Sequence, residues 1–277
     1  MENSSIKIRL AIMIMSLSIL TVTGQQTPVS PTPVPADAAS PRTDKNSQIA
    51  HEQLLEKAKK GRIDVYFLGD SITRRWGTSD EQYKHFYRNW KENFWGWNAG
   101  NFGWGGDTTQ NILWRLENGE LDNVNPRVIV LAAGTNNVGR RSPTAEPDSR
   151  IEDISKGIRA ILDLCRKKAP NATIILMGIF PRNDNMEVMP IIEKINQKIA
   201  GFADGKKIRF VSVNRKMADK NGKLFPGVTV PDGLHLDVKG YQIWADAIKP
   251  ILRKLLGPPA KVDLAPPPTG DPSAVKK

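Results

Sequence analysis

The chain has 277 residues, carries a formal net charge of +11 and contains one cysteine. The basic residues are scattered and no nucleic-acid-binding motif is present, so the charge is interpreted as solvated surface, not as a nucleic-acid interface. Cys165 cannot form an internal disulfide, and its apolar neighbours predict a buried position on a helix. The spacing of histidines and cysteines matches no common metal-binding motif, so neither a metal nor another cofactor is expected.

The two ends of the chain differ from its middle. Residues 1–24 place Lys7 and Arg9 ahead of an apolar run, which is typical of a signal peptide and short for a membrane span. We therefore expect export to the periplasm or the exterior, with an uncleaved N-terminal membrane anchor as the alternative. Residues 25–47 and 257–277 are rich in proline and small residues, which predicts a disordered linker and a disordered tail. The middle, residues 48–256, is long enough for one domain with a full core.

Strand-like and helix-like segments alternate along this middle part. Short apolar runs predict strands at residues 65–68, 97–102, 128–132, 173–177 and 208–211. Amphipathic stretches predict helices at residues 46–60, 109–116, 149–168, 189–202 and 239–255. Apolar strands separated by amphipathic helices are typical of a parallel sheet covered on both faces. The predicted fold is a single three-layer α/β/α domain with a mostly parallel sheet of about five strands.

The first predicted strand ends in residues 67–71, Phe-Leu-Gly-Asp-Ser. The glycine permits a tight turn, and parallel sheets bind their ligands beyond the carboxyl ends of the strands. Ser71 is therefore placed to present its hydroxyl to a substrate. The run differs from the Gly-x-Ser-x-Gly elbow, because Ile72 and Thr73 follow the serine.

A serine hydroxyl is a poor nucleophile unless a base, usually histidine, removes its proton. The chain has three histidines. His51 lies in the polar stretch before the first strand, and His85 lies in an aromatic-rich segment, residues 83–97, that could be a packed helix or a loop. His235 lies in a turn before the last helix, where Asp232 could hold its Nδ1 proton and leave Nε2 to accept a proton from serine. A surface histidine beside a turn aspartate explains the same spacing equally well.

Two more polar groups follow the second and third predicted strands. They are Gly-Trp-Gly-Gly-Asp at residues 103–107 and Gly-Thr-Asn-Asn at residues 134–137. The amides of the glycine pair, the side chain of Asn136 and the Ser71 amide could donate to the oxyanion of an acyl-transfer intermediate. A tight turn, a phosphate cradle and a capped turn are the alternatives, although no Gly-Lys-Ser/Thr follows the glycines. All these groups follow strands, so one edge of the sheet could gather them.

The order Gly-Asp-Ser, Gly-Gly-Asp, Gly-Thr-Asn-Asn and Asp-x-x-His resembles the SGNH (GDSL-type) esterase superfamily. Within it, residues 101–109 and 113–121 are similar to the catalytic subunits of intracellular platelet-activating-factor acetylhydrolase. The resemblance implies a flavodoxin-like SGNH fold and a reaction without metal or organic cofactor.

The resemblance also implies a role for each site residue. Ser71 would be the nucleophile, His235 the general base and Asp232 the carboxylate that orients it. The oxyanion hole would consist of the Ser71 amide, Gly106 and Asn136.

These features predict a serine esterase that hydrolyses short-chain, chiefly acetyl, esters of small molecules, glycans or lipids. A sugar O-acyltransferase with the same acyl-enzyme is one alternative, and a non-catalytic glycan-binding envelope protein is another. A group of aromatic residues could form a sugar-stacking surface, although core packing is their commoner role; they are Trp90, Phe94, Trp95, Trp97 and Trp104. Membrane association is expected only through an uncleaved N-terminal segment, and Asn171 is a glycosylation sequon only in a host that glycosylates secreted proteins.

Overall fold

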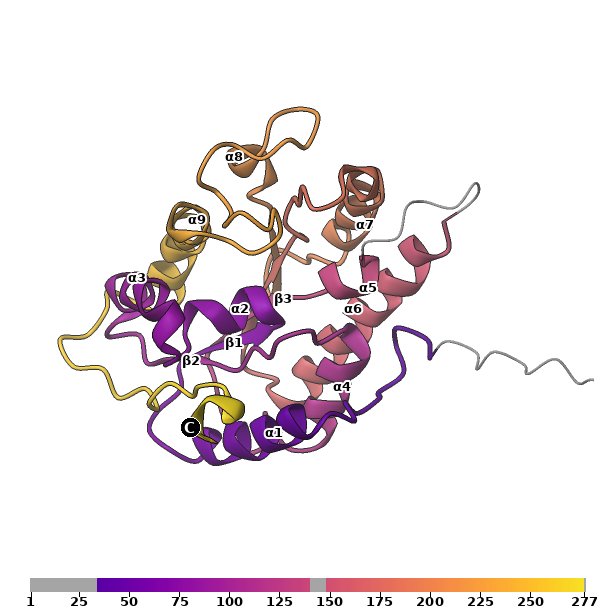
Figure 1. The fold of residues 1–277 in the computed structure, drawn as a ribbon. Coiled ribbons are helices and arrows are strands. Elements are labelled where there is room, and N and C mark those ends of the chain that lie inside the picture. The colour runs from indigo at the N-terminus through magenta and orange to yellow at the C-terminus, as the bar shows by residue number, and fades with distance from the viewer. Residues whose placement is uncertain (1–33, 140–147, 277) are drawn as a thin grey trace, which may run out of the picture. The chain divides into compact units, whose positions relative to one another are not determined.

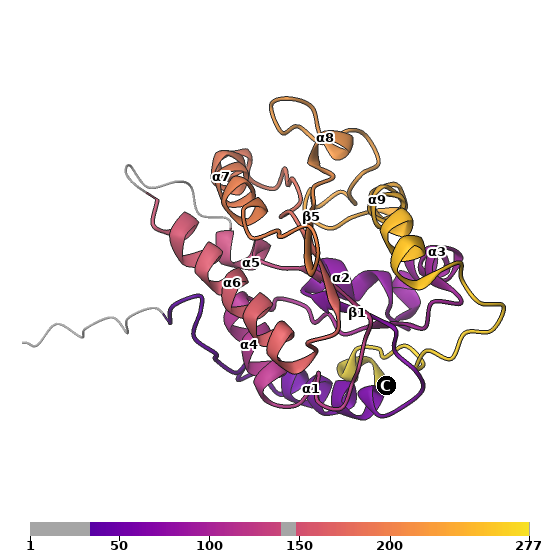
Figure 2. The same cartoon turned by 180° about the vertical axis from the view of Figure 1, so that it is seen from behind.

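The computed structural model describes residues 34–139 and 148–276. The predicted signal peptide, residues 1–24, and the first part of the predicted linker lie outside the described residues. In the described part, a parallel sheet lies between two layers of helices, as Figures 1 and 2 show from opposite sides. The three-layer α/β/α fold predicted from the sequence is therefore confirmed.

The strands of the sheet are β1 (Val65–Gly69), β2 (Ala99–Asn101), β3 (Val128–Ala132), β4 (Thr173–Met177) and β5 (Ile208–Val211). Their spatial order is β2-β1-β3-β4-β5, and every neighbouring pair is parallel. The chain first moves from β1 to β2 and then returns past β1 to β3. This reversal creates a switch point between β1 and β3, where open parallel sheets form their ligand crevice.

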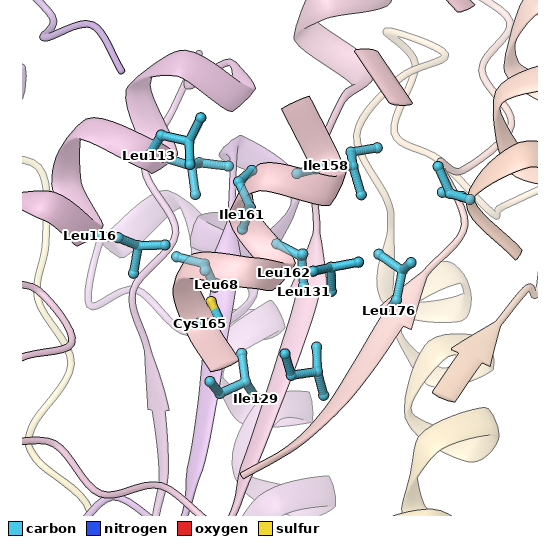
Figure 3. Close-up of a cluster of buried hydrophobic side chains, with 14 of the residues drawn as sticks. Leu68, Leu113, Leu116, Ile129, Leu131, Ile158, Ile161, Leu162, Cys165 and Leu176 are labelled. Carbon is cyan, nitrogen blue, oxygen red and sulfur yellow. The ribbon is translucent and has the colours of Figure 1, made fainter. Parts of the chain in front are cut away.

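One face of the sheet packs against an aliphatic layer. It is covered by α1 (Lys45–Ala58), α4 (Thr109–Glu117), α6 (Arg150–Lys168) and α7 (Met189–Ala200). Apolar residues of α6 recur every three or four positions, which gives the helix one apolar stripe; they are Ile154, Ile158, Ile161, Leu162 and Cys165. Figure 3 shows Ile158, Ile161, Leu162 and Cys165 of this stripe beside Leu68 of β1 and Leu131 of β3. Cys165 is fully buried here, as predicted.

The opposite face of the sheet packs against an aromatic layer. Alternate strand residues point to this face because the side-chain period of a strand is two. It is covered by α2 (Ser71–Trp76), α3 (Lys84–Phe94) and α9 (Val238–Leu256). The ring of Phe67 on β1 lies 4.6 Å from Trp90 of α3 and 6.2 Å from Trp244 of α9, measured between centroids. The ring of Trp76 on α2 lies 6.1 Å from the same Phe67 ring, so the aromatic layer also holds α2, the helix that begins at Ser71, against the end of β1.

The structure distinguishes the five aromatic residues for which the sequence left open either core packing or sugar stacking, because their exposures differ. Trp90, Phe94, Trp97 and Trp104 are at most 7% exposed, whereas Trp95 is 54% exposed. Trp90, Phe94 and Trp97 therefore pack in the aromatic core, whereas Trp104 is buried in the turn after β2, where its ring packs against the guanidinium of Arg74. A sugar-stacking surface made from the whole group is excluded by their burial.

The predicted strands and helices all occur, with ends within two residues of the predicted ones. The sequence missed α2, α5 (Thr135–Val138), α8 (Asn214–Met217) and 3₁₀ turns at Glu81–Tyr83, Met186–Val188 and Pro272–Lys276. It also left open whether the region of α3 was a helix. Segments this short contain too few turns for a helical period to be visible.

The predicted tail, residues 257–277, differs from the expectation of disorder. All but its last residue is described, and Figure 1 shows it in yellow, running from α9 to the neighbourhood of α1. The carbonyl of Leu264 accepts from the Arg62 amide at 2.8 Å, and the Asp271 amide donates to Oδ1 of Asp80 at 2.6 Å. Composition indicated too little apolar surface for folding alone, but backbone hydrogen bonds to the domain hold the segment.

The predicted linker, residues 25–47, also differs where it is described. Ala36 is fully buried; its amide donates to Asp153 of α6 and its carbonyl accepts from Thr109 of α4. Helix α1 begins at Lys45, inside the predicted linker. None of the helices within residues 34–139 and 148–276 is both long and apolar enough to cross a membrane.

Candidate active site

Four segments that follow strands meet at the carboxyl edge of the sheet. They are the β1–α2 turn with Ser71, the β2–α4 turn with Gly106, the β3–α5 turn with Asn136, and the long loop before α9 with His235. Hydrogen bonds between these segments, given below, show that the structure brings the predicted residues together. The site lies at the β1/β3 switch point.

Ser71 is the first residue of α2. Its predecessor Asp70 caps the helix by accepting from the Ile72 amide at 2.9 Å. Aspartate is among the best N-cap residues, so the sequence starts a helix directly after the strand. Burial raises the pKa of Asp70 to about 7. The result is a partly exposed serine hydroxyl held on a rigid junction between β1 and α2.

His235 connects Ser71 to Asp232. Its Nε2 lies 2.9 Å from Ser71 Oγ, and its Nδ1 lies 2.7 Å from Asp232 Oδ2. An ionised carboxylate only accepts hydrogen bonds, so Nδ1 carries the proton and Nε2 is free to accept one from the serine. The other Asp232 oxygen accepts from the amides of Leu234 and His235, both at 2.9 Å. These bonds make the turn rigid and aim the imidazole at Ser71.

The surroundings of His235 keep its imidazole neutral. Burial lowers its pKa, the hydrogen bond to Asp232 opposes this, and the positive charge of Arg75 lowers it further. Burial acts to raise the pKa of Asp232, but the hydrogen bonds from His235 and Leu234 prevail and lower it. The pair is therefore a neutral imidazole beside an ionised carboxylate, which is the state that a general base requires.

Asn136 lies on α5, directly after β3. Its Nδ2 donates to the carbonyl of Asp107 at 2.8 Å, which links the turn after β3 to the turn after β2. An amide nitrogen has two hydrogens, so one remains for a ligand at the edge of the sheet. Asn137 is used differently, because its Oδ1 accepts from the Thr109 amide, the first of α4, at 2.9 Å. The two adjacent asparagines therefore have separate tasks.

The glycine pair after β2 borders the serine. A side chain on Gly105 would place its Cβ 4.0 Å from the Cβ of Ser71. Gly106 has φ +79°, a conformation that favours glycine. The next residue, Asp107, is buried and its Oδ2 lies 2.6 Å from Nε of Arg115. Burial raises the pKa of Asp107 to about 6, and the charge of Arg115 opposes this rise. The ion pair between Asp107 and Arg115 therefore anchors the turn after β2.

Three arginines near the site were missed by the sequence analysis. Arg75 lies four residues after Ser71 on α2, with Nη1 3.6 Å from Asp232 Oδ2. Arg182 is buried and donates to the carbonyl of Thr135 at 2.9 Å. Arg42 donates to the turn after β2 from the N-terminal segment. Helical spacing from Ser71 could have indicated Arg75, but no local pattern connects the other two to the site.

The other two histidines lie elsewhere. His51 of α1 is buried, and its Nδ1 lies 2.9 Å from Oε1 of Glu120. His85 is exposed on α3 and contacts the ring of Phe86. Of the three histidines, all of which lie in the described residues, His235 is the one that is hydrogen-bonded to Ser71.

A separate hollow of about 790 Å³ lies between α7 and the segment that follows β5. Phe210, Asn214 and Phe225 are among the residues that line it. It contains neither Ser71 nor His235. This hollow is therefore separate from the candidate active site, which is identified by its side chains and their hydrogen bonds.

A parallel α/β/α sheet with a serine, a histidine and an aspartate at its switch point defines an acylhydrolase of the SGNH type. The chain belongs to the GDSL-like lipase/acylhydrolase family, whose pattern matches residues 67–243. This membership makes it a carboxylic ester hydrolase and confirms the resemblance noted in the sequence.

Individual proteins that are similar to this chain are consistent with its membership of this family. The chain is 31% identical over 240 residues to platelet-activating factor acetylhydrolase IB subunit alpha1 of Bos taurus, covering 85% of this chain and 93% of the relative. A GDSL-like lipase from Bacteroides thetaiotaomicron has a similar structure, with TM-score 0.57, 24% identity and coverage of 76% and 98% of the two chains. An acetyl-xylooligosaccharide esterase from Geobacillus stearmophilus gives TM-score 0.51, 20% identity and coverage of 69% and 93%. These two structures support the fold.

Proposed function

We propose that the protein is a serine esterase that hydrolyses short-chain, chiefly acetyl, esters of carbohydrates or lipids. The observation that carries the proposal is the continuous line of hydrogen bonds from Asp232 through His235 to Ser71. Nucleophile, base and orienting carboxylate lie at hydrogen-bond distances without any rearrangement, which is the geometry that acyl transfer through serine needs.

In the proposed first step, His235 Nε2 accepts the Ser71 proton while Oγ attacks the ester carbonyl. The oxyanion that forms would accept from the amides of Ser71 and Gly106 and from Nδ2 of Asn136. The imidazolium is stabilised by Asp232, and it then gives its proton to the departing alcohol. The C–O bond to the alcohol breaks, and the acyl group stays on Ser71.

In the second step, a water molecule replaces the alcohol. His235 takes a proton from the water, whose oxygen attacks the acyl carbonyl, and the same donors hold the second oxyanion. Collapse breaks the bond to Ser71 Oγ, which regains its proton from His235. The products are a carboxylic acid and a free enzyme, so the atoms and protons balance with water as the co-reactant.

The preference for short acyl groups is supported by the residue next to the glycine pair. Trp104 is 7% exposed, and the guanidinium of Arg74 lies 4.7 Å from the centre of its ring. A large, fixed side chain beside the proposed oxyanion hole leaves little room for a long chain. Trp104→Ala is expected to raise kcat/KM for octanoyl relative to acetyl esters about 10- to 100-fold. A ratio that does not change would refute this role for Trp104.

The experiment that tests the proposal combines labelling with a substrate panel. A fluorophosphonate probe should label Ser71, and Ser71→Ala should lower kcat by roughly 10⁴-fold or more. The panel contains p-nitrophenyl esters of increasing length, acetylated xylan, acetylated sialic acid and a short-chain phospholipid. Labelling at another residue, or full activity of Ser71→Ala, would contradict the proposal, and a preference for octanoyl esters would contradict its acyl-length part.

Two neighbouring questions, acyl transfer to a sugar and export, are tested separately. If a hydroxyl group of a sugar competes with water for the acyl-enzyme, acylated sugar appears as a product and the transferase alternative gains support. Export by residues 1–24 stays a prediction, and N-terminal sequencing of the protein from its host would test it.

A further inference from the structure

Arg42 lies against the glycine pair from the N-terminal segment. Its Nη1 donates to the carbonyl of Gly105 at 3.0 Å and lies 3.6 Å from Oδ1 of Asp107. A Cβ built on Gly106 would lie 2.9 Å from the same nitrogen. The guanidinium therefore contacts the outer side of the turn whose inner side borders Ser71.

The guanidinium is itself held in place. Its Nε and Nη2 lie 2.9 and 2.8 Å from Oδ2 of Asp44, so the arginine and the carboxylate form a two-point contact. The other oxygen of Asp44 caps α1 by accepting from the Ser47 amide at 2.8 Å. Arg42 is thus anchored to the start of a helix, and its side chain is 31% exposed.

The carbonyl that Arg42 binds belongs to the same peptide group as the Gly106 amide. In a trans peptide the C=O and the N–H point in opposite directions, and no cis peptide bond occurs in the described residues. Fixing the Gly105 oxygen on the guanidinium therefore directs the Gly106 N–H away from Arg42. A charged donor on the oxygen also polarises the peptide and strengthens the amide as a donor.

This peptide group needs an external support because glycine lies on both sides of it. Glycine adopts negative and positive φ with similar ease, so rotation of a Gly–Gly peptide meets little steric resistance. An amide that points the wrong way part of the time cannot act as a preorganised oxyanion donor.

We propose that Arg42 is a positioning residue, which holds the Gly105–Gly106 peptide so that the Gly106 amide faces the oxyanion. The inference rests on the proposed function, because it assumes that Gly106 donates during acyl transfer. Arg42 does not touch the reacting atoms in this proposal and acts through the peptide group alone.

The test compares Arg42→Ala and Arg42→Lys with Arg62→Ala. Arg62 is a matched control, because it also pairs with an aspartate two residues later, Asp64, at 2.9 Å. Arg42→Ala should lower kcat on the order of 10- to 100-fold, less than the loss of a donor itself, and leave KM within about twofold. Arg42→Lys should be intermediate, because an ammonium lacks the planar fork that contacts Gly105 and Asp44 together. The control should keep its kcat.

Chemical rescue separates positioning from a structural role. Added guanidinium or methylguanidinium, well below unfolding concentrations, should raise kcat of Arg42→Ala and leave Arg62→Ala unchanged. The rate of fluorophosphonate labelling at Ser71 should fall and recover in parallel, because the phosphonyl oxygen occupies the same hole. Thermal unfolding shows whether each variant is folded under the assay conditions.

The outcomes distinguish the positioning role from the function on which it rests. An unchanged kcat in Arg42→Ala, with Ser71→Ala inactive, would overturn the role of Arg42 and leave the esterase proposal standing. If kcat of Arg42→Ala falls only in proportion to the fraction of folded protein, and added guanidinium does not raise it, the positioning role of Arg42 would be overturned as well. Full activity of Ser71→Ala would instead remove the proposed function.

Discussion

Two histidine–carboxylate pairs occur within residues 34–139 and 148–276, and their difference is instructive. His51 on α1 pairs through Nδ1 with Glu120 at 2.9 Å, and His235 pairs through Nδ1 with Asp232 at 2.7 Å. As hydrogen bonds the two are nearly equal. The side chains of the first pair are 9% and 0% exposed, whereas those of the second are 12% and 35% exposed.

What separates the pairs is the group at the other ring nitrogen. Nε2 of His235 meets the hydroxyl of Ser71, while the ring of His51 packs at 4.8 Å from Trp114. Glu120 is shared with Arg115, which in turn supports Asp107. The first pair therefore belongs to a buried network of charged side chains, and the second to the more exposed candidate active site. A carboxylate beside a histidine does not by itself make a catalytic base.

The largest expected difference between the pairs is in catalysis. His235→Ala should lower kcat by roughly 10⁴-fold or more, close to the defect of Ser71→Ala, because nucleophile and base act as a unit. His51→Ala should keep kcat within a few-fold but lower the free energy of unfolding by about 1–3 kcal/mol, because Glu120 loses a buried partner. Kinetics and urea unfolding of both variants measure this. If His51→Ala abolishes turnover of folded protein, the base has been misassigned.

The next largest effect concerns the carboxylate of the second pair. Asp232→Asn should lower kcat by about 10⁴-fold, because it removes the charge that stabilises the imidazolium, with His235→Ala the more damaging change. It should also move the ascending limb of the kcat/KM profile to lower pH, since the carboxylate raises the His235 pKa. A pH profile with stopped assays checks both points. A limb that moves to higher pH would contradict the assigned pairing.

The two neighbouring asparagines extend the comparison to the oxyanion hole. Asn136→Ala should lower kcat by about 10²–10³-fold with a much smaller change in KM. Asn137→Ala should chiefly cost stability, about 1 kcal/mol, because its side chain accepts from the first amide of α4. Equal kinetic defects in the two variants would mean that Asn136 is a turn residue and not a donor.

The smallest expected effect is electrostatic. The reaction needs neutral His235, and a lowered pKa keeps the imidazole neutral to lower pH, so the ascending limb should lie below the ordinary value of 6.5. Arg75 contributes to this lowering, so Arg75→Gln should move the limb to higher pH. Salt should weaken the effect of Arg75 in the parent protein, because the side chain is partly exposed. His85→Ala, a change at an exposed histidine, is the control that should leave the limb in place.

Elements that depend only on local sequence were predictable, because they need no contact with a distant part of the chain. Val65–Gly69 reads as a buried strand from its own residues, and α6 reads as a helix from its apolar stripe. Ser71, Asn136 and His235 were candidates because each follows a strand or lies in a turn, and the resemblance to the SGNH superfamily gave each its expected role. The parallel sheet then brings strand ends to one edge whatever the loops contain.

Features that depend on long-range contacts were not predictable. Arg42 lies 63 residues from the carbonyl that it binds, and its own segment has the composition of a linker. The Pro-rich tail is held by hydrogen bonds to residues far from it, such as Asp80. Trp95 and Trp97 are two residues apart, yet only the second is buried. Composition reports what a segment can bury alone, and these segments use partners elsewhere in the chain.

By itself, the sequence determined the fold class, the strands and the residues that meet at the edge of the sheet. The reason is that hydrophobic period, turn glycines and strand ends are local properties, and a parallel sheet converts them into a common edge. Only the tertiary structure showed that His235 contacts Ser71 while His51 pairs with Glu120, that Asn137 binds the first amide of α4, and that Arg42 contacts the glycine turn. Those contacts depend on distances between atoms far apart in the chain, which arise only once the two layers of helices have packed against the sheet.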